Sequence, residues 1–443
     1  MRQADIIIIG GGPGGYETAA EAAARGKKVI LFERNRLGGT CLNRGCIPTK
    51  CLCATAKRLH DIRTASTLGI STADATVDYS AVRGRIAEVT ATLREGIEGI
   101  LGNVEVIKAE ARLAPGPTVE AEGESYTAPA IIIATGSAPA ALKVPGSETA
   151  LDSDGVLALE TVPESMVIIG GGVIGLEFAS VFAGFGCTVT VLEYCAEVLP
   201  GFDRDIAKRL RSSLGRRGID IVTGAEVTAV DGGRSVTYLR KGKEKTVDAA
   251  CVVAAVGRHP VVPGGLDTLG IECDRRGYIA CDSRYETNVP GIYAIGDVNG
   301  RCMLAHAASA QGRVVLGEEV DMDVMPAVVF TDPECASVGL TSEQLADSDR
   351  EYTVVRLPYG ANGKALASGE ADGVLKLIVE KDSGLIAGCH CVGAHAADII
   401  AEAAVAMNGS LTAHELAVRC IHAHPTIGEL LSTAAAGTLK RGV

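Results

Sequence analysis

A glycine-rich segment occurs twice in the 443-residue chain, each time in the same setting. The first copy reads IIIIGGGPGG over residues 6–15, and the second reads VIIGGGVIG over residues 167–175. Each is an apolar strand pattern that runs into a glycine turn and a helix, and a second apolar strand ending in glutamate follows each. The first glycine and the glutamate are 23 residues apart in both copies (33 − 10 and 193 − 170). The repeat predicts two βαβ dinucleotide-binding folds of the Rossmann type in an α/β protein.

The glycines of such a turn have separate tasks. The first makes the tight turn, the second lets a pyrophosphate approach the backbone, and the third lets helix and strand pack closely. The pyrophosphate then lies at the helix N-terminus, where free N–H groups and the helix dipole favour anions. One glycine turn before a helix can be purely structural, but two copies with matched strands and glutamates favour two nucleotide sites. We expect these sites at Gly10, Gly12 and Gly15, and at Gly170, Gly172, Val173, Ile174 and Gly175.

The glutamates after the second strands indicate which nucleotide each site prefers. Glu33 and Glu193 can accept hydrogen bonds from ribose hydroxyls, whereas a 2′-phosphate would be repelled there and would need an arginine. Tyr194, Cys195 and Ala196 follow Glu193, and none of them is basic. The second site is therefore predicted to take NAD rather than NADP. The alternative is that each glutamate is an ordinary solvated acid at the end of a strand.

Further apolar segments closed by glycine predict the domain organisation. Residues 130–136 and 250–257 are expected to be buried strands that complete the two nucleotide domains, and residues 291–297 a strand that precedes a helix from about Ala305 to Glu319. After Met325 come strands such as 374–379 and a helix at about 396–407. We expect the domains to be 1–150 (first nucleotide domain, which also contains Cys41 and Cys46), 151–265 (second nucleotide domain), 266–324 (a segment completing the first) and 325–443 (C-terminal α+β domain).

Composition excludes some classes of partner. The formal net charge is −12 and the chain has no dense run of lysine and arginine, which argues against nucleic-acid binding. The apolar stretch near the N-terminus, Ile6–Ile9, is far shorter than a signal-peptide core or the roughly 20 residues of a membrane span. We therefore expect a soluble, cytoplasmic protein with neither nucleic acid nor membrane as partner.

One pair of cysteines stands out among fourteen. In a long chain without a secretory signal, most cysteines are expected to be reduced, buried and apolar in behaviour. Cys41 and Cys46 instead lie in the glycine-flanked segment GGTCLNRGCIPTK, residues 38–50, where two thiols with four residues between them can close a small disulfide ring. Pro48 suits the first turn of a helix, which puts Cys46 near a helix N-terminus, where a thiolate is stabilised. The segment predicts a reversible dithiol switch.

A metal site is not expected. Cys51 and Cys53 follow the redox pair, but the spacing lacks the paired CxxC geometry of zinc sites. Helix residues after Pro48 would point the two thiols in different directions. Both are predicted to lie in the core.

Together with the repeat, residues 38–50 resemble the redox-disulfide motif of the FAD-dependent pyridine nucleotide-disulfide oxidoreductases. The resemblance covers essentially the whole chain, is closest to the dihydrolipoamide dehydrogenases, and extends to IGD at 295–297 and HPTIGE at 424–429. It implies an FAD domain, an NAD domain and a C-terminal dimerisation domain. The implied reaction is oxidation of protein-bound dihydrolipoamide to lipoamide with reduction of NAD to NADH. The implied partners are a second copy of the chain and a lipoyl-bearing protein or the acyltransferase core of a 2-oxoacid dehydrogenase or glycine cleavage complex.

The resemblance also implies roles for individual residues. Cys41 matches the interchange thiol that meets the substrate, and Cys46 the thiol that faces the flavin. Lys50 and Glu177 match the ion pair beside the flavin. His424 matches the acid-base catalyst, which Glu429 orients and which the partner subunit supplies. The remaining cofactor residues are expected at Glu33, Gly39, Thr40, Lys50, Thr135, Gly136, Asp297 and Ala305 for FAD, and at Gly257 for NAD.

The histidine assignment also has support from the residues themselves. Pro425 forces His424 out of helical geometry and onto a loop, and a carboxylate five residues on can turn back to it. His422 is the rival base, and His306, in a segment that matches a packing region near the flavin, is expected to be structural.

The sequence departs from the family at three positions. Val261 and Gln311 stand where asparagine and glutamate are common, which puts local hydrogen bonds in doubt, and Arg44 stands where an apolar residue is common. Two other functions remain open: an NADH-dependent reductase of another small disulfide, and a protein that acts chiefly as a docking subunit of a multienzyme complex.

Overall fold

The computed structural model describes residues 1–116 and 118–440. Its contacts divide the chain into two compact units. Unit 1 consists of residues 1–51, 80–140 and 257–322, and unit 2 of residues 52–79, 141–256 and 323–443. Each unit is described by itself below. The expected class, mixed α/β with parallel sheets and two dinucleotide folds, is confirmed.

Unit 1 contains a parallel five-stranded sheet with the order β18-β8-β2-β3-β4. Its central strand, β2 (Ile6–Ile9), is buried from end to end, and alternate isoleucines enter the cores on the two faces of the sheet. Side chains alternate across a strand, so an unbroken apolar run suits a strand that is covered on both faces. The other strands are β3 (Val29–Phe32), β4 (Glu105–Ile107), β8 (Ala130–Ile133) and β18 (Ile292–Ala294).

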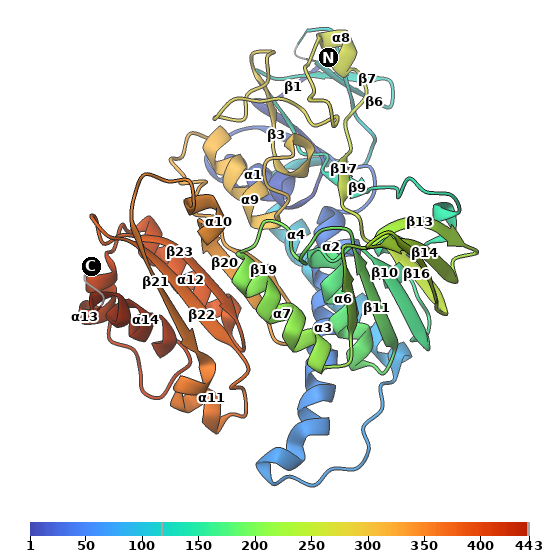
Figure 1. Ribbon diagram of the computed structural model, residues 1–443. Helices are drawn as coiled ribbons and strands as arrows, with labels where there is room; N and C mark the ends of the chain where they lie inside the picture. The colour runs from blue at the N-terminus through green and yellow to red at the C-terminus, as the bar shows by residue number, and fades with distance from the viewer. Residues whose placement is uncertain (117, 441–443) are drawn as a thin grey trace. The chain divides into compact units, whose positions relative to one another are not determined.

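Helices α1 (Pro13–Ala24) and α9 (Ala305–Val315) pack against each other (Figure 1). The predicted end of α9 at Glu319 is wrong by four residues, because Gly317 has a φ of +93° and turns the chain away. The other helices of unit 1 are α2 (Gly39–Arg44), the start of α3 (Cys46–Thr64), α4 (Tyr79–Ile100) and α8 (Leu266–Leu269). A second sheet has the strand order β1 (Arg2–Gln3), β7 (Glu124–Thr127), β6 (Thr118–Ala121) and β5 (Arg112–Ala114). Strands β9 (Ser137–Pro139) and β17 (Arg258–Pro260) form a two-stranded sheet.

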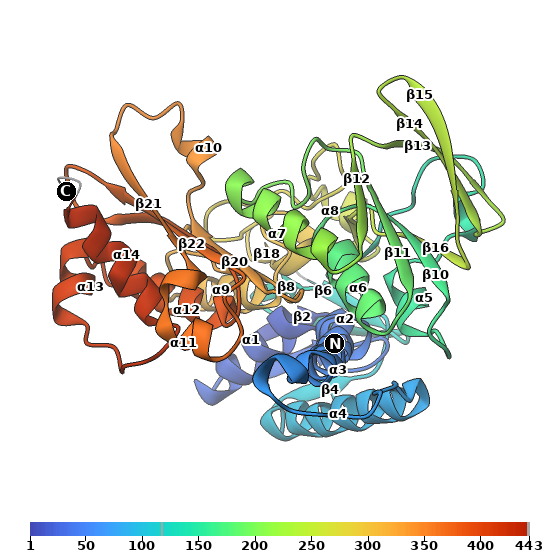
Figure 2. The ribbon, with the colours of Figure 1, turned by 60° about the horizontal axis from the view of Figure 1, so that its bottom comes forward.

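Unit 2 repeats the parallel pattern in a four-stranded sheet, β12-β11-β10-β16. The strands are β10 (Ser165–Ile169), β11 (Thr188–Glu193), β12 (Asp220–Thr223) and β16 (Cys251–Ala254), and the helices are α5 (Ser153–Leu157), α6 (Val173–Gly184) and α7 (Arg204–Arg216). A separate antiparallel sheet of β13 (Glu226–Asp231), β14 (Ser235–Arg240) and β15 (Lys243–Asp248) accompanies it (Figure 2).

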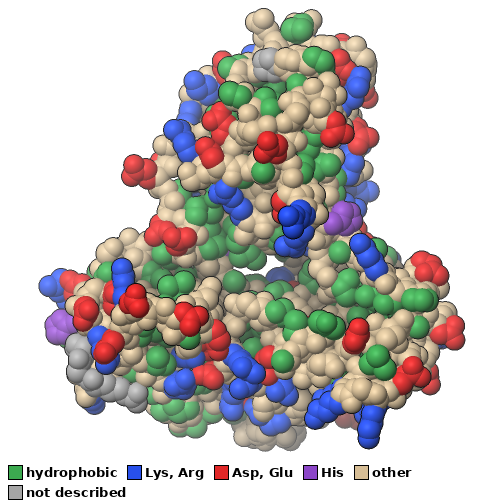
Figure 3. Space-filling view, turned by 45° about the horizontal axis from the view of Figure 1, so that its top comes forward, with side chains coloured by type: hydrophobic (Ala, Val, Ile, Leu, Met, Phe, Trp, Pro, Cys, Tyr) green, Lys and Arg blue, Asp and Glu red, His purple; other side chains and the backbone are tan. Residues whose placement is uncertain are grey.

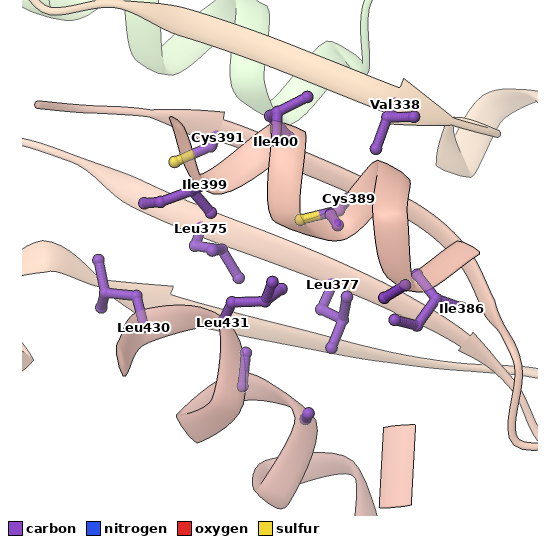
Figure 4. Close-up of a cluster of buried hydrophobic side chains, with 14 of the residues drawn as sticks. Val338, Leu375, Leu377, Ile386, Cys389, Cys391, Ile399, Ile400, Leu430 and Leu431 are labelled. Atoms are coloured by element: carbon purple, nitrogen blue, oxygen red, sulfur yellow. The ribbon is translucent and has the colours of Figure 1, made fainter. Parts of the chain in front are cut away.

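The C-terminal part of unit 2 is an antiparallel five-stranded sheet with helices on one face. The strand order is β19 (Ala327–Val329), β20 (Cys335–Gly339), β23 (Ile386–Val392), β22 (Val374–Glu380) and β21 (Tyr352–Pro358). Helices α12 (Ala396–Asn408) and α14 (Glu429–Leu439) cover this face, where Leu375, Leu377, Cys389 and Cys391 enter a buried cluster (Figure 4). Shorter helices are α10 (Ser342–Leu345), α11 (Gly363–Ala367) and α13 (Ala413–Arg419).

The other face of this sheet holds an ion pair that the sequence did not reveal. Lys376, between Leu375 and Leu377, is 1% exposed, and its Nζ lies 2.7 Å from Oδ2 of Asp203, which is fully buried at the N-terminus of α7. Asp205 is a second partner, at 2.9 Å. Burial opposes ionisation of Asp203, but the Lys376 ammonium and the Ser342 N–H outweigh it and lower the pKa of the carboxyl.

Surface features agree with the composition. Figure 3 shows lysine and arginine side chains interspersed with aspartate and glutamate over the face that it draws. Within the described part of the chain, no helix is long and apolar enough to cross a membrane.

Lys376→Met is expected to destabilise unit 2 by about 3–5 kcal/mol, because it leaves Asp203 charged and buried without its cation. The thermal unfolding midpoint of the holoenzyme should fall by roughly 10 °C. Because the folded-state pKa of Asp203 is lowered, the stabilisation is present above about pH 4 and is lost as the pH falls through the folded pKa.

Lys381→Met is the matched control. Lys381 follows the same strand and pairs with Glu351 at 2.8 Å, but both side chains are exposed. Exposed pairs contribute little, so the midpoint should hardly move. Equal losses for the two variants would contradict the assignment of the Lys376 pair as a buried one.

Candidate active site

The redox loop lies directly on the first glycine turn. The Gly38 N–H donates to the Gly11 carbonyl at 2.8 Å, and a Cβ on Gly39 would come within 2.7 Å of the Gly12 Cα. Gly38 and Gly39 both have positive φ, +91° and +56°. Only glycine combines these backbone angles with so close an approach. The contact places helix α2, which carries Cys41, beside the turn predicted to hold the first nucleotide.

The two cysteines of the loop have different surroundings. Cys41 is half-buried in α2, and Cys46 is exposed at the first residue of α3, with Pro48 in the first turn of that helix. A hydrogen bond with Cys46 raises the pKa of Cys41, burial adds to this, and the Lys50 cation opposes it. The raised pKa favours the protonated form of Cys41.

The first glycine turn has the shape of a diphosphate cradle. A Cβ on Gly10 would lie 2.3 Å from the Ala134 carbonyl oxygen, and one on Gly15 would lie 1.8 Å from the Gly10 oxygen, so both positions require glycine. At Gly12 the nearest atom is 3.9 Å away, which leaves the backbone open to a ligand. Thr135 follows Ala134, and its hydroxyl oxygen is buried and has no partner among the described residues. An open cradle and an unsatisfied hydroxyl fit a bound dinucleotide.

Asp297 has an orientation suited to a ligand hydroxyl. It lies in the short 3₁₀ turn Gly296–Asn299, and its Oδ2 accepts a hydrogen bond from the Ser137 hydroxyl. Arg258 Nε donates to the same hydroxyl oxygen at 2.7 Å, so the Ser137 proton must point to Asp297. The second carboxylate oxygen remains for a ligand. The other FAD candidates of unit 1 are placed by structure as follows: Thr40 in α2, Gly136 at a φ of +73°, and Ala305 at the first residue of α9.

The second glycine turn repeats this geometry in unit 2. A Cβ on Gly170 would lie 2.4 Å from the Ala255 oxygen, and one on Gly175 would lie 2.0 Å from the Gly170 oxygen. A Cβ on Gly172 would meet nothing within 4 Å. Val173, the first residue of α6, is 37% exposed beside this opening, and Ile174 follows it. The site can accept a second nucleotide. Gly257, with a φ of +111°, falls within unit 1.

The two glutamates accept hydrogen bonds from their glycine turns, and the sequence did not predict these contacts. Glu33 accepts hydrogen bonds from the N–H groups of Gly11 and Asn35, at 2.8 and 2.7 Å. Glu193 accepts from Gly171 and Cys195, both at 2.6 Å, and is 6% exposed. The alternative of a solvated acid at the strand end is therefore wrong for Glu193, whereas Glu33 remains half-buried. Each oxygen keeps a second lone pair, so the carboxylate that fixes the turn can also accept from a ribose.

A His–Glu pair lies in the C-terminal part of unit 2. His424 Nδ1 is 3.0 Å from Glu429 Oε1, and the Thr426 N–H donates to Glu429 Oε2 at 2.8 Å. The Thr426 N–H and His424 lower the pKa of Glu429. An ionised Glu429 holds the ring with its proton on Nδ1, which leaves Nε2 free to accept a proton. The His424 side chain is 81% exposed.

His422, the rival base, forms a separate pair. Its Nε2 is 2.7 Å from Glu402 Oε1, its side chain is 13% exposed, and its Nδ1 is buried without a partner among the residues that the structure describes. Because the His422 side chain is only 13% exposed and its Nε2 is paired with Glu402, His422 has less access to a substrate than His424. His306 is the second residue of α9.

Other predicted residues fall in separate parts of the structure. Lys50 lies one turn after Cys46 on α3 and belongs to unit 1, whereas Glu177 lies in α6 of unit 2, is buried, and accepts from the Phe330 N–H at 2.9 Å. Their pairing stays a prediction.

The expectation for the other cysteines was partly wrong. Only five of the fourteen are buried, because small thiols also occupy half-buried element ends and loops; Cys51 is buried, but Cys53 is only half-buried. No group of residues in 1–116 and 118–440 could hold a metal ion.

The departures from the family pattern have local consequences. Gln311 is fully buried, and its Oε1 accepts from the Gly296 N–H and from Asn299 Nδ2, at 2.7 and 2.8 Å. Its Nε2 has no partner in the described part of the chain. A carboxylate at this position could accept both bonds without leaving a donor unpaired. The backbone of Val261 keeps a hydrogen bond to the Gly136 oxygen, at 2.9 Å.

Family models cover both parts of the chain. Residues 4–312 match the model described as pyridine nucleotide-disulphide oxidoreductase, and residues 325–435 match the dimerisation domain of the same family. The chain belongs to this family. It is therefore an oxidoreductase with FAD and NAD as cofactors, and it carries a dimerisation domain, which supports a homodimer.

Curated relatives and solved structures agree with the family. The chain is 41% identical to a dihydrolipoyl dehydrogenase from Geobacillus stearothermophilus, over 98% of this chain and 96% of that protein. A mitochondrial dihydrolipoyl dehydrogenase from Pisum sativum is 37% identical, over 99% and 92%. Among solved structures, an HOCl-induced flavoprotein disulfide reductase from Escherichia coli, RclA, is 30% identical with a TM-score of 0.86, over 98% of this chain and 99% of that one.

Glu193→Arg is expected to reduce the preference for NAD over NADP at least about tenfold, because it exchanges a carboxylate that repels the 2′-phosphate for a cation that attracts it. The measurement is kcat/KM with each nucleotide. Glu193→Gln removes the charge but keeps an acceptor for a backbone N–H. It therefore separates repulsion of the 2′-phosphate from support of the second glycine turn. Equal turnover with both nucleotides in the unmodified enzyme would refute the role of Glu193.

Proposed function

We propose that the protein is a dihydrolipoyl dehydrogenase, which oxidises protein-bound dihydrolipoamide to lipoamide and reduces NAD to NADH. The main support is the contact of the redox loop with the first glycine turn, which brings a dithiol beside a nucleotide cradle. The glutamate of the second cradle suits NAD. The similarity to dihydrolipoyl dehydrogenases extends over nearly the full length of the chain.

The thiol chemistry follows from the different surroundings of the two cysteines. His424 Nε2 takes a proton from one substrate thiol, and the thiolate attacks Cys41 Sγ of the Cys41–Cys46 disulfide, so that Cys46 leaves as a thiolate. The second substrate thiol then attacks the substrate sulfur that is bonded to Cys41, its proton passes to the departing Cys41 sulfur, and lipoamide is released. The substrate has lost two electrons and the cysteine pair has gained them. FAD held in unit 1 would supply the acceptor through which the two electrons of the cysteine pair pass to NAD, and the disulfide would re-form with release of the Cys41 proton.

The FAD site consists of residues of unit 1. Gly10, Gly12 and Gly15 would hold the diphosphate, Glu33 a ribose, and Asp297 a ribityl hydroxyl, with Gly39, Thr40, Lys50, Thr135, Gly136 and Ala305 lining the site. The NAD site would use Gly170, Gly172, Val173, Ile174, Gly175, Glu193 and Gly257. Lys50 and Glu177 would form an ion pair beside the flavin.

The assembly and location are part of the proposal. Two copies of the chain would share each active site, with His424 and Glu429 supplied by the partner copy. The complete assembly would include a lipoyl-bearing protein or the acyltransferase core of a 2-oxoacid dehydrogenase or glycine cleavage complex, in the cytoplasm. The domains proposed are 1–150, 151–265, 266–324 and 325–443, the last for dimerisation.

A second candidate is a reductase that uses NADH to reduce another small disulfide, which the similarity to the Escherichia coli disulfide reductase favours. The deciding assay measures NADH formation from dihydrolipoamide and NAD, beside reduction of glutathione disulfide with NADH and with NADPH. We expect turnover in the first assay to exceed the others at least about a hundredfold. Faster glutathione reduction, or no NADH formation from dihydrolipoamide, would refute the proposed activity.

His424→Gln is expected to lower dihydrolipoamide oxidation by about a hundred- to ten-thousandfold, the contribution of a positioned base. Reduction of ferricyanide by NADH, which needs neither the base nor the thiols, should be unchanged. Glu429→Gln should cost less, since the ring remains. His422→Gln is the matched control, and its effect should be mild. A larger loss for His422→Gln than for His424→Gln would reverse the assignment.

Hybrid dimers test the origin of the histidine. Subunits with His424→Gln and subunits with Cys41→Ser are each inactive alone, but a mixed dimer would contain one intact site. Activity should return once exchange is verified by mass spectrometry. Verified hybrids without activity would mean that His424 acts within its own subunit or is not the base.

A further inference from the structure

Asn43, which lies between the two redox cysteines, is bound to the backbone that precedes them. Its Nδ2 donates to the carbonyl oxygens of Leu37 and Gly39, both at 2.9 Å, with Arg36 O at 3.4 Å. These carbonyls belong to the segment that contacts the first glycine turn. The side chain therefore ties the middle of the redox loop to the part of the loop that is already fixed.

Arg94 determines how Asn43 is oriented. It reaches the loop from α4, 51 residues further along the chain, and its Nη2 donates to Asn43 Oδ1 at 2.7 Å. A guanidinium has only donors, so the amide oxygen must face Arg94 and the NH₂ group must face the carbonyls. Arg94 Nε is buried and has no partner among the described residues. A half-buried cation with an unsatisfied donor is costly, which indicates that its contact with Asn43 has a role.

The far end of the loop is held as well. The Thr49 hydroxyl donates to the Gly45 carbonyl at 2.7 Å, and a Cβ on Gly45 would lie 2.9 Å from the Thr40 carbonyl oxygen. The chain between Cys41 and Cys46 is thus restrained at its start, middle and end, and none of these contacts involves a cysteine sulfur. Because these contacts do not need the disulfide, they remove conformational freedom from the loop independently of disulfide formation.

We propose that Asn43 and Arg94 are positioning residues that brace the redox loop for closure of the Cys41–Cys46 disulfide. Closing a ring costs conformational entropy, and a loop that is already held loses less of it. The brace therefore shifts the thiol–disulfide equilibrium toward the disulfide. The inference rests on the proposed redox role of the cysteine pair.

The test measures this equilibrium directly in the holoenzyme. The protein is equilibrated with mixtures of reduced and oxidised glutathione, in which oxidised glutathione takes two electrons and two protons from the dithiol. Free thiols are then alkylated, and the peptide that contains Cys41 and Cys46 is quantified by mass spectrometry. We expect Asn43→Ala to lower the equilibrium constant for disulfide formation about tenfold, which is about 30 mV for a two-electron couple. Arg94→Gln should lower it about threefold or more.

Arg85→Gln is the matched control, because Arg85 lies on the same helix and its side chain is exposed. The equilibrium constant for disulfide formation in Arg85→Gln should stay within about twofold of the wild-type value. FAD content and ferricyanide reduction by NADH should be normal in all variants. If Asn43→Ala does not fold, Arg94→Gln decides alone, since it removes the orienting donor and leaves the loop sequence intact.

The outcomes separate the brace from the proposed function. If Arg94→Gln and any folded Asn43→Ala protein match the wild-type constant, the brace is refuted while the redox pair stands, even if their thermal stability is lower. If the wild-type pair forms no disulfide at any glutathione ratio, the redox function itself fails. A lowered constant in the loop variants but not in Arg85→Gln supports the brace.

Discussion

The close contact between two glycines governs the chemistry of this protein. Gly39 approaches Gly12 so closely that a side chain on Gly39 would meet backbone, and the Gly38 N–H completes the contact through the Gly11 carbonyl. Backbone packed on backbone is stiff, because no side chain can rotate to absorb a displacement. The first nucleotide cradle and the helix that carries Cys41 are therefore parts of one rigid arrangement. Electron exchange between a thiol pair and a bound cofactor depends on such fixed separation.

Within this arrangement, the surroundings make two identical side chains chemically different. Cys41 is half-buried and its pKa is raised by the hydrogen bond with Cys46. Cys46 is exposed at the start of a 19-residue helix, where the helix dipole favours negative charge. The raised pKa favours a proton on Cys41, and the position of Cys46 at a helix N-terminus favours negative charge there. The short separation of four residues keeps the two cysteines close together. The boundary between α2 and α3 lies between them, so each cysteine has different surroundings.

The sequence predicted what depends on local patterns and missed what depends on distant partners. The glycine turns, the strands beside them and the His424–Glu429 contact follow from periodicity and short spacing, and the structure has them. The end of α9 was misplaced because a single glycine with positive φ outweighs the helical pattern around it. The Lys376–Asp203 pair joins residues 173 positions apart, and Arg94 meets Asn43 across 51. No periodic signal connects such positions, so only the folded chain reveals them.

The two nucleotide folds show how a repeat can acquire different functions. In both copies a glutamate accepts the N–H of the glycine turn, so this interaction supports the turn and does not distinguish the sites. The difference lies in what contacts the second glycine. Gly12 is approached by the redox loop, whereas Gly172 has no atom near its Cβ position and stands beside the exposed Val173. A cofactor bound at the first turn would lie beside the redox loop, which contacts that turn. The backbone at Gly172 is therefore open to close approach by a nucleotide.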